Sequence, residues 1–166
     1  MKKLRFGVVG LGMGKGHALG YQSHLQAELV ALGDVDEQRL CAAADEMGVP
    51  ETYTDVKAMF AKANLDAVSL ATPNKFHAPL TIAAFKAGLH VLSEKPMALT
   101  VKEAERMLAA SKAADRNLMI NFSPNPSRDG DGAALQALCS PSAWRAGRSV
   151  TVAARIGCAY SKEQEP

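Results

Sequence analysis

Short apolar strands alternate with helical segments along most of this chain, and this alternation restricts the fold more than any other feature. We predict strands at residues 4–10, 28–34, 51–53, 66–71, 90–93 and 118–122. Helices are predicted at residues 15–25, 37–47, 55–62, 76–87 and 100–115. Buried strands that are separated by crossover helices require a mostly parallel sheet with helices on both faces. The predicted fold class is therefore α/β, with a doubly wound sheet of the Rossmann type.

The first strand runs directly into a glycine cluster, where residues 4–16 read LRFGVVGLGMGKG. Glycines allow a tight turn and a close approach of the backbone to a phosphate, and the start of the following helix attracts the anion. Gly10, Gly12 and Gly14, with Met13 between the last two, form G-x-G-x-G, one residue shorter than the usual dinucleotide fingerprint. Because the cluster lies between a strand and a helix, we expect it to bind a pyrophosphate.

Asp34 lies at the end of the second predicted strand. A carboxylate in this place accepts hydrogen bonds from the hydroxyls of an adenine ribose, and it repels a 2′-phosphate. No arginine follows immediately, so the sequence favours NAD over NADP as the cofactor. The alternative is a solvent-facing residue of the strand-end turn, because Asp36 and Glu37 are acids of the next helix start.

Composition removes several classes of function. The formal net charge is +2 and aromatic residues make up 5% of the chain, which argues against a nucleic-acid partner. The three cysteines have no C-x-x-C spacing, so we expect neither a disulfide framework nor a metal site. No segment approaches the length of a membrane span, and the expected location is the cytoplasm.

Two further clusters follow later strands: residues 71–77 read ATPNKFH, and residues 93–98 read SEKPMA. Together with the glycine cluster and the His17-Ala18 pair after it, they resemble the glucose–fructose oxidoreductase/inositol dehydrogenase family (Gfo/Idh/MocA) over residues 4–122. The resemblance implies an oxidoreductase that transfers a hydride between a nicotinamide cofactor and a sugar, polyol or related hydroxyl compound.

The same resemblance assigns roles to individual residues. It implies that Thr72, Pro73, Asn74 and His77 lie along the cofactor.

It also implies that Glu94 and Lys95 lie near the nicotinamide, that Lys95 is the catalytic candidate, and that the Lys95–Pro96 peptide is cis. Each role has a plainer alternative. Lys95 would then be a solvated loop lysine, Asn74 a turn residue and His77 a structural residue, and His17 is expected to pack on the first helix.

The resemblance ends after Phe122, where serine, proline, glycine and arginine become frequent. The family's second domain supplies an Asp-x-x-x-His pair, which this chain lacks, since its last histidine is His90. We expect a dinucleotide-binding domain at residues 1–122 and an atypical tail at 123–166. The tail contains an apolar stretch at 133–138 and a candidate strand at 149–156. It is either a small cap or a truncated or frame-disrupted remnant of a substrate domain.

Three hypotheses about function remain open at this point. The first is a sugar or polyol oxidoreductase of which the chain retains the cofactor half, with oligomers formed by the full-length family. The second is a non-catalytic dinucleotide-binding module or an inactive fragment. The third is a methyltransferase, because a G-x-G-x-G turn with a carboxylate after the second strand also suits S-adenosylmethionine. The threonine-proline-asparagine and glutamate-lysine-proline clusters have no role in that third reading.

Overall fold

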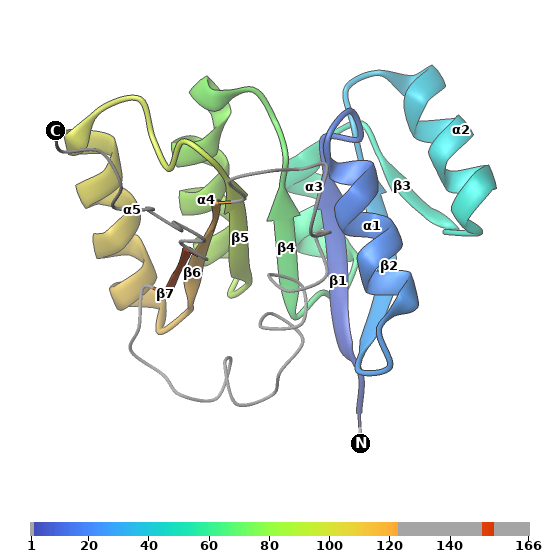
Figure 1. Cartoon of the computed structure of the whole chain (residues 1–166), viewed down its shortest axis with the longest axis horizontal. Helices are drawn as coiled ribbons and strands as arrows, with labels where there is room; N and C mark the ends of the chain where they lie inside the picture. The colour runs from blue at the N-terminus through green and yellow to red at the C-terminus, as the bar shows by residue number, and fades with distance from the viewer. Residues whose placement is uncertain (1, 123–150, 155–166) are drawn as a thin grey trace, which may run out of the picture.

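A computed structural model of the chain describes residues 2–122 and 151–154. Its centre is a sheet in the order β3-β2-β1-β4-β5-β6-β7, in which every neighbouring pair is parallel. All strands therefore run toward the same edge, the upper one in Figure 1. The strands are β1 (Leu4–Val9), β2 (Ala27–Gly33), β3 (Glu51–Tyr53), β4 (Ala67–Leu70), β5 (His90–Glu94), β6 (Leu118–Phe122) and β7 (Thr151–Ala154).

Helices cover both faces of this sheet, which confirms the predicted doubly wound α/β class. One face carries the first two helices and the other face carries the remaining three (Figure 1). The helices are α1 (Gly14–Ser23), α2 (Glu37–Met47), α3 (Val56–Lys62), α4 (His77–Lys86) and α5 (Val101–Ala114), with a short 3-10 helix, η1 (Asn74–Phe76), before α4.

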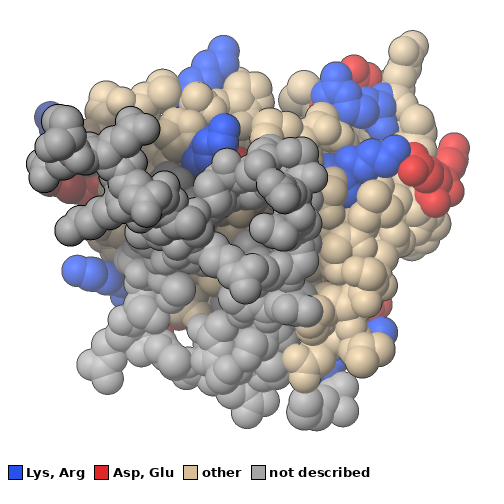
Figure 2. Space-filling view, viewed as in Figure 1, with Lys and Arg blue, Asp and Glu red and all other residues tan. Residues whose placement is uncertain are grey.

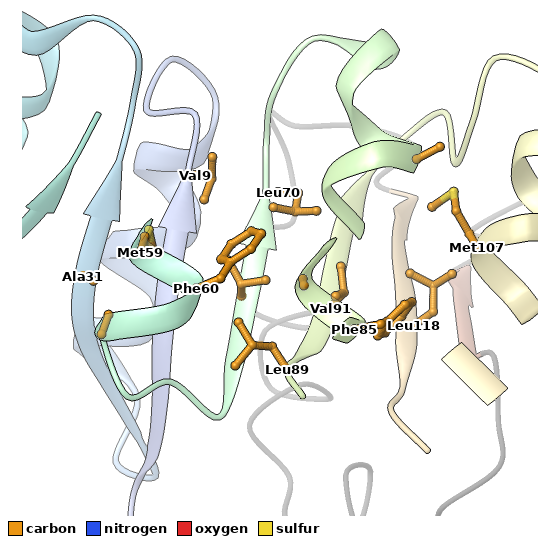
Figure 3. Close-up of a cluster of buried hydrophobic side chains, with 14 of the residues drawn as sticks. Val9, Ala31, Met59, Phe60, Leu70, Phe85, Leu89, Val91, Met107 and Leu118 are labelled. Atoms are coloured by element: carbon orange, nitrogen blue, oxygen red, sulfur yellow. The ribbon is translucent and has the colours of Figure 1, made fainter. Parts of the chain in front are cut away.

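Alternating side chains of the strands build a separate hydrophobic core on each face. On the α1 and α2 side, Phe6 of β1 stacks on Tyr21 of α1 with ring centroids 4.1 Å apart. On the other side, Phe60 of α3, Phe85 of α4 and Met107 of α5 pack over the strands (Figure 3). Because both faces of the sheet are buried against helices, polar groups are expected at the ends of the strands.

Most predicted boundaries agree with the structure to within one or two residues. Helix α1 ends earlier than predicted, where His24 Nδ1 accepts the N–H of Gln26 at 3.1 Å. At the start of α5, Thr100 Oγ1 accepts the N–H of Glu103, and the Glu103 carboxylate accepts the N–H of Leu99.

Strand β7 lies inside the candidate strand at 149–156 and extends the sheet beyond β6. The apolar stretch predicted at 133–138 lies outside the described residues. No helix within residues 2–122 or 151–154 combines the length and apolar character needed to cross a bilayer.

Candidate functional site

The sheet order reverses between β1 and β4, which are neighbours although their connections leave in opposite directions. Backbone hydrogen bonds tie the ends of three strands together at this point: Gly10 N–H donates to Gly33 O at 2.8 Å, and Ala71 N–H donates to Val9 O at 2.8 Å. In open α/β sheets, the crevice beyond the carboxyl ends at such a reversal is the usual ligand site.

The glycine cluster forms a cradle whose three positions are constrained differently. Gly10 has a φ of +87°, and a Cβ atom there would lie 2.4 Å from Ala71 O. A Cβ on Gly14 would lie 2.9 Å from Val8 Cγ1, so this glycine lets α1 approach β1 closely. A Cβ on Gly12 would meet no protein atom within 4 Å. The loop therefore leaves space beside an exposed backbone at Gly12, which fits a pyrophosphate in front of α1.

Asp34 is buried, with 4% of its surface exposed, so the solvent-facing alternative is wrong. Its Oδ2 accepts the N–H of Leu11 in the glycine loop at 2.8 Å, and its Oδ1 accepts the N–H of Asp36 at 2.9 Å. Burial alone would raise the pKa of Asp34, but these N–H groups and Arg39 outweigh it and hold the pKa below its usual value. The carboxylate is thus ionised and fixed against the glycine loop.

Arg39, in the first turn of α2, is a site residue that the sequence reasoning missed. Its Nη1 lies 3.2 Å from Oδ2 and 3.4 Å from Oδ1 of Asp34, and its Nη2 lies 3.0 Å from Asp36 Oδ2. Only an arginine directly after the strand was expected to reach this position, whereas the first turn of α2 brings residue 39 back over the strand end. Basic and acidic side chains gather at the upper right of Figure 2, over α2 and the start of α1.

Glu94, at the end of β5, belongs to a buried polar cluster. His17 Nε2 lies 3.0 Å from Glu94 Oε1, and Asn121 Nδ2 donates to the same oxygen at 2.6 Å. The N–H of Lys95 donates to Oε2 at 3.2 Å. Burial alone would raise the pKa of Glu94, but these donors outweigh it and lower the pKa. The cluster joins α1, β5 and β6, and it fixes the backbone at Lys95.

His17 and Asn121 were not predicted to have these partners. His17 lies on the buried face of α1 with Gly14, Ala18 and Tyr21, and this spacing was the available signal. A histidine on a buried helix face needs a polar partner. The partner itself is set by the packing of α1 on the sheet, which the sequence does not display.

His77 bridges two loops from the first turn of α4. The ring is fully buried, with Nδ1 2.7 Å from Pro96 O and Nε2 2.8 Å from Thr72 O. The predicted cis peptide between Lys95 and Pro96 is present. Both ring nitrogens are thus engaged with backbone carbonyls, as the structural alternative for His77 anticipated. A direct contact of His77 with a cofactor stays a prediction.

Four of the predicted residues are exposed at the same edge, namely Met13, Pro73, Asn74 and Lys95. Pro73 and Asn74 begin the segment after β4, and Met13 is 64% exposed in the glycine loop. The Lys95 side chain is exposed, and its ammonium has no hydrogen bond or ion pair within the described part of the chain. The structure therefore brings the predicted residues to one edge, and their contacts with a cofactor stay predictions.

The sequence matches the family described as "Oxidoreductase family, NAD-binding Rossmann fold" over residues 4–122. A myo-inositol 2-dehydrogenase from Thermotoga maritima is 37% identical over 120 residues, which cover 72% of this chain and 36% of the relative. A D-xylose 1-dehydrogenase (NADP(+)) from Haloferax volcanii is 35% identical over 120 residues, covering 72% of this chain and 37% of the relative.

Among solved structures, the chain is similar to scyllo-inositol dehydrogenase from Lactobacillus casei with bound NAD(H) and scyllo-inositol. The TM-score is 0.70 at 33% identity, and the match covers 73% of this chain and 36% of the other. The chain thus spans little more than a third of the length of the proteins that it matches, and the match lies in their dinucleotide-binding part.

Proposed function

This chain belongs to the Gfo/Idh/MocA oxidoreductase family, and from this membership we propose that residues 1–122 bind NAD for hydride transfer to or from a sugar, polyol or related hydroxyl compound. One observation carries the proposal: the buried Asp34 carboxylate is bonded to the backbone of the glycine loop at Leu11. The proposed ribose-selecting acid and the proposed phosphate cradle are therefore held together, which supports binding of a dinucleotide here.

The proposed position of the cofactor follows from this unit. The pyrophosphate would lie at Gly12, where the backbone is open and the start of α1 favours an anion. Asp34 would accept from the ribose hydroxyls and disfavour a 2′-phosphate, which supports NAD over NADP. Met13, Thr72, Pro73 and Asn74 would line the same crevice, because their segments follow β1 and β4 at the reversal point.

Bound nicotinamide would supply the hydride acceptor or donor. We propose that the Lys95 ammonium orients the reacting hydroxyl, because its backbone is fixed by Glu94 while its side chain is exposed at the strand end. Glu94 and His77 would act as positioning residues for this loop, since their polar atoms are engaged internally. General acid–base catalysis by a side chain at the reacting hydroxyl raises the rate of a reaction of this kind roughly 10²–10⁴-fold.

The substrate class rests on the relatives alone. The Thermotoga maritima relative is a myo-inositol dehydrogenase, and the Lactobacillus casei structure contains scyllo-inositol. Ring polyols and sugars are therefore the first compounds to test for turnover by the purified chain with NAD. Binding of NADH without turnover of any of them would support the non-catalytic module instead.

A fluorescence titration with NADH tests the cofactor site. Gly12→Val should abolish saturable binding, because the added side chain fills the space at the cradle while meeting no protein atom at its Cβ. Ala109→Val on the exposed surface of α5 is the matched control and should bind as the unaltered chain does. Unchanged NADH affinity in a folded Gly12→Val protein would rule out this site, and displacement of NADH by S-adenosylmethionine would favour the methyltransferase.

A further inference from the structure

We propose that the Glu94 carboxylate is a fixed negative charge that makes the site favour the oxidised form of the nicotinamide cofactor over the reduced form. The inference rests on the proposed function and deepens it, because it adds an electrostatic role to the positioning role of Glu94. A polar cluster that only held its loop in place would treat both forms of the cofactor alike. The inference therefore concerns the charge of this side chain and not its hydrogen bonds.

The first step is that this charge is not neutralised by the side chains that enclose it. Glu94 is buried, and its Oε1 lies 3.0 Å from His17 Nε2 and 2.6 Å from Asn121 Nδ2. His17 Nδ1 is buried and has no hydrogen-bond partner among the described residues. A proton on this nitrogen would be a buried donor without an acceptor, so the arrangement calls for a neutral ring with its proton on Nε2. The three side chains together then carry the full negative charge of the carboxylate.

The second step is that the neighbouring cation does not cancel this charge. Lys95 follows Glu94 in the chain, and its backbone N–H donates to Glu94 Oε2 at 3.2 Å. Its side chain, however, is exposed, and its ammonium forms no ion pair within the described part of the chain. Water and salt screen an exposed charge strongly and an enclosed charge much less. The field at the end of β5 is therefore dominated by the carboxylate.

The third step is the position of Glu94 relative to the proposed cofactor. Strands β2, β1, β4 and β5 are consecutive in the sheet, so the ends that carry Asp34 and Glu94 lie about 14 Å apart at a spacing of about 4.8 Å per strand. A dinucleotide with one ribose at Asp34 and its pyrophosphate at Gly12 extends across the reversal point toward the end of β5. The nicotinamide is therefore the part of the cofactor that would lie nearest to Glu94.

The fourth step is the difference in charge between the two forms of the cofactor. The oxidised nicotinamide ring carries a positive charge, and the reduced ring is neutral. An enclosed carboxylate a few ångströms away should change the relative affinity for the two forms by about tenfold. A tenfold ratio corresponds to about 30 mV in the reduction potential of a bound two-electron couple. The bound couple would be more strongly reducing than the free couple, which favours reduction of a carbonyl compound over oxidation of the hydroxyl compound.

Glu94→Gln tests the inference in titrations of the purified chain, with NADH followed by fluorescence and NAD⁺ followed by calorimetry. The unaltered chain should bind NAD⁺ at least as tightly as NADH. The variant keeps an oxygen that can accept from His17 and Asn121 but removes the charge. Its ratio of NAD⁺ to NADH affinity should fall about tenfold. Glu105→Gln removes a solvated charge from the exposed surface of α5 and should leave the ratio unchanged.

Glu94→Asp separates the charge from the structural role. This variant keeps the carboxylate on a shorter side chain, so it should lose stability but keep the affinity ratio of the unaltered chain. A ratio that falls equally in both variants, or in neither, would overturn this inference alone. An unaltered chain that binds NADH more tightly than NAD⁺ would also overturn it, whether or not the variants fold. An unaltered chain that unfolds cooperatively but binds neither form would overturn the proposed function itself.

Discussion

Two buried carboxylates, Asp34 and Glu94, lie at the carboxyl edge of the sheet, and their surroundings differ. The Asp34 carboxylate accepts hydrogen bonds from two backbone N–H groups and forms an ion pair with the half-exposed Arg39. Glu94 is enclosed with His17 and Asn121, whose side chains are themselves buried. An exposed partner can leave for a ligand, but an enclosed partner cannot leave without stranding a buried polar group. The β1–β2 end of the edge is thus adaptable, and the β5–β6 end is fixed.

The largest effect should come from breaking the fixed end. Glu94→Ala leaves His17 Nε2 and Asn121 Nδ2 buried without their acceptor, which should lower the free energy of unfolding by about 3 kcal/mol. Urea unfolding followed by circular dichroism measures this loss. Glu46→Ala removes an exposed pair with Lys15 and should cost less than about 1 kcal/mol. Equal losses in the two variants would show that the Glu94 cluster is not a special support.

The His77 bridge should give the next largest effect. His77→Ala removes the ring that contacts the carbonyls of Thr72 and Pro96, and the free energy of unfolding should fall by about 2 kcal/mol. His24→Ala, at the half-buried end of α1, loses one local bond and should change stability by less than about 1 kcal/mol. If His77→Ala unfolds at the same urea concentration as the unaltered chain, the bridge does not hold the two loops.

A pH series distinguishes the two carboxylates from His90, a titratable residue elsewhere in the molecule. The pKa values of Asp34 and Glu94 are lowered, so both carboxylates stay charged as the pH falls through the range where histidine titrates. Burial, with the Arg116 charge, lowers the pKa of His90 to about 4, and its Nδ1 accepts the N–H of Asn117.

The unfolded chain therefore binds a proton at His90 near pH 6.5, whereas the folded chain binds this proton only near pH 4. This part of the stability is fully present above pH 6.5 and is lost as the pH falls toward 4. The loss should be on the order of 1 kcal/mol, because the ring is partly solvated. Urea midpoints between pH 7 and pH 4 measure it. His90→Asn keeps an acceptor without the titration, and an equally steep pH dependence in this variant would contradict the assignment.

The smallest effect on stability should occur at the adaptable end. Arg39→Gln should change the free energy of unfolding by less than about 0.5 kcal/mol, because the arginine is half-exposed and Asp34 keeps its two backbone donors. Thermal unfolding with matched samples measures this change. A loss as large as that of Glu94→Ala would mean that the two ends are equally fixed, and the comparison between them would fail.

Sequence reasoning recovered nearly all of the fold because the signals for it are local. Apolar runs, the Asp36 and Thr100 caps and the left-handed Gly48 and Gly88 positions each act within a few residues of themselves. The end of α1 lies two residues before the predicted one, at a position that neither a glycine nor a proline marks in the sequence.

The site was only partly predictable for a related reason. The placement of the glycines and Asp34 at one edge of the sheet could be predicted, because it depends on their position after a strand. The bond between His17 and Glu94 joins residues 77 apart in the sequence and depends on how α1 packs over β5. Arg39 was missed because its reach depends on the direction in which the first turn of α2 points. Such pairings follow from packing and not from spacing.

The bond from Leu11 N–H to Asp34 Oδ2 gives one side chain two duties. The oxygen that we propose discriminates between cofactors also accepts a hydrogen bond from the glycine turn and keeps this turn in shape. A substitution to alanine or glycine would admit a bulkier ribose substituent but would release the turn at the same moment. We therefore expect viable routes to altered cofactor use to pass through side chains that still carry an acceptor, such as asparagine or serine. The glycine loop therefore limits which residues can replace Asp34 as much as the ligand does.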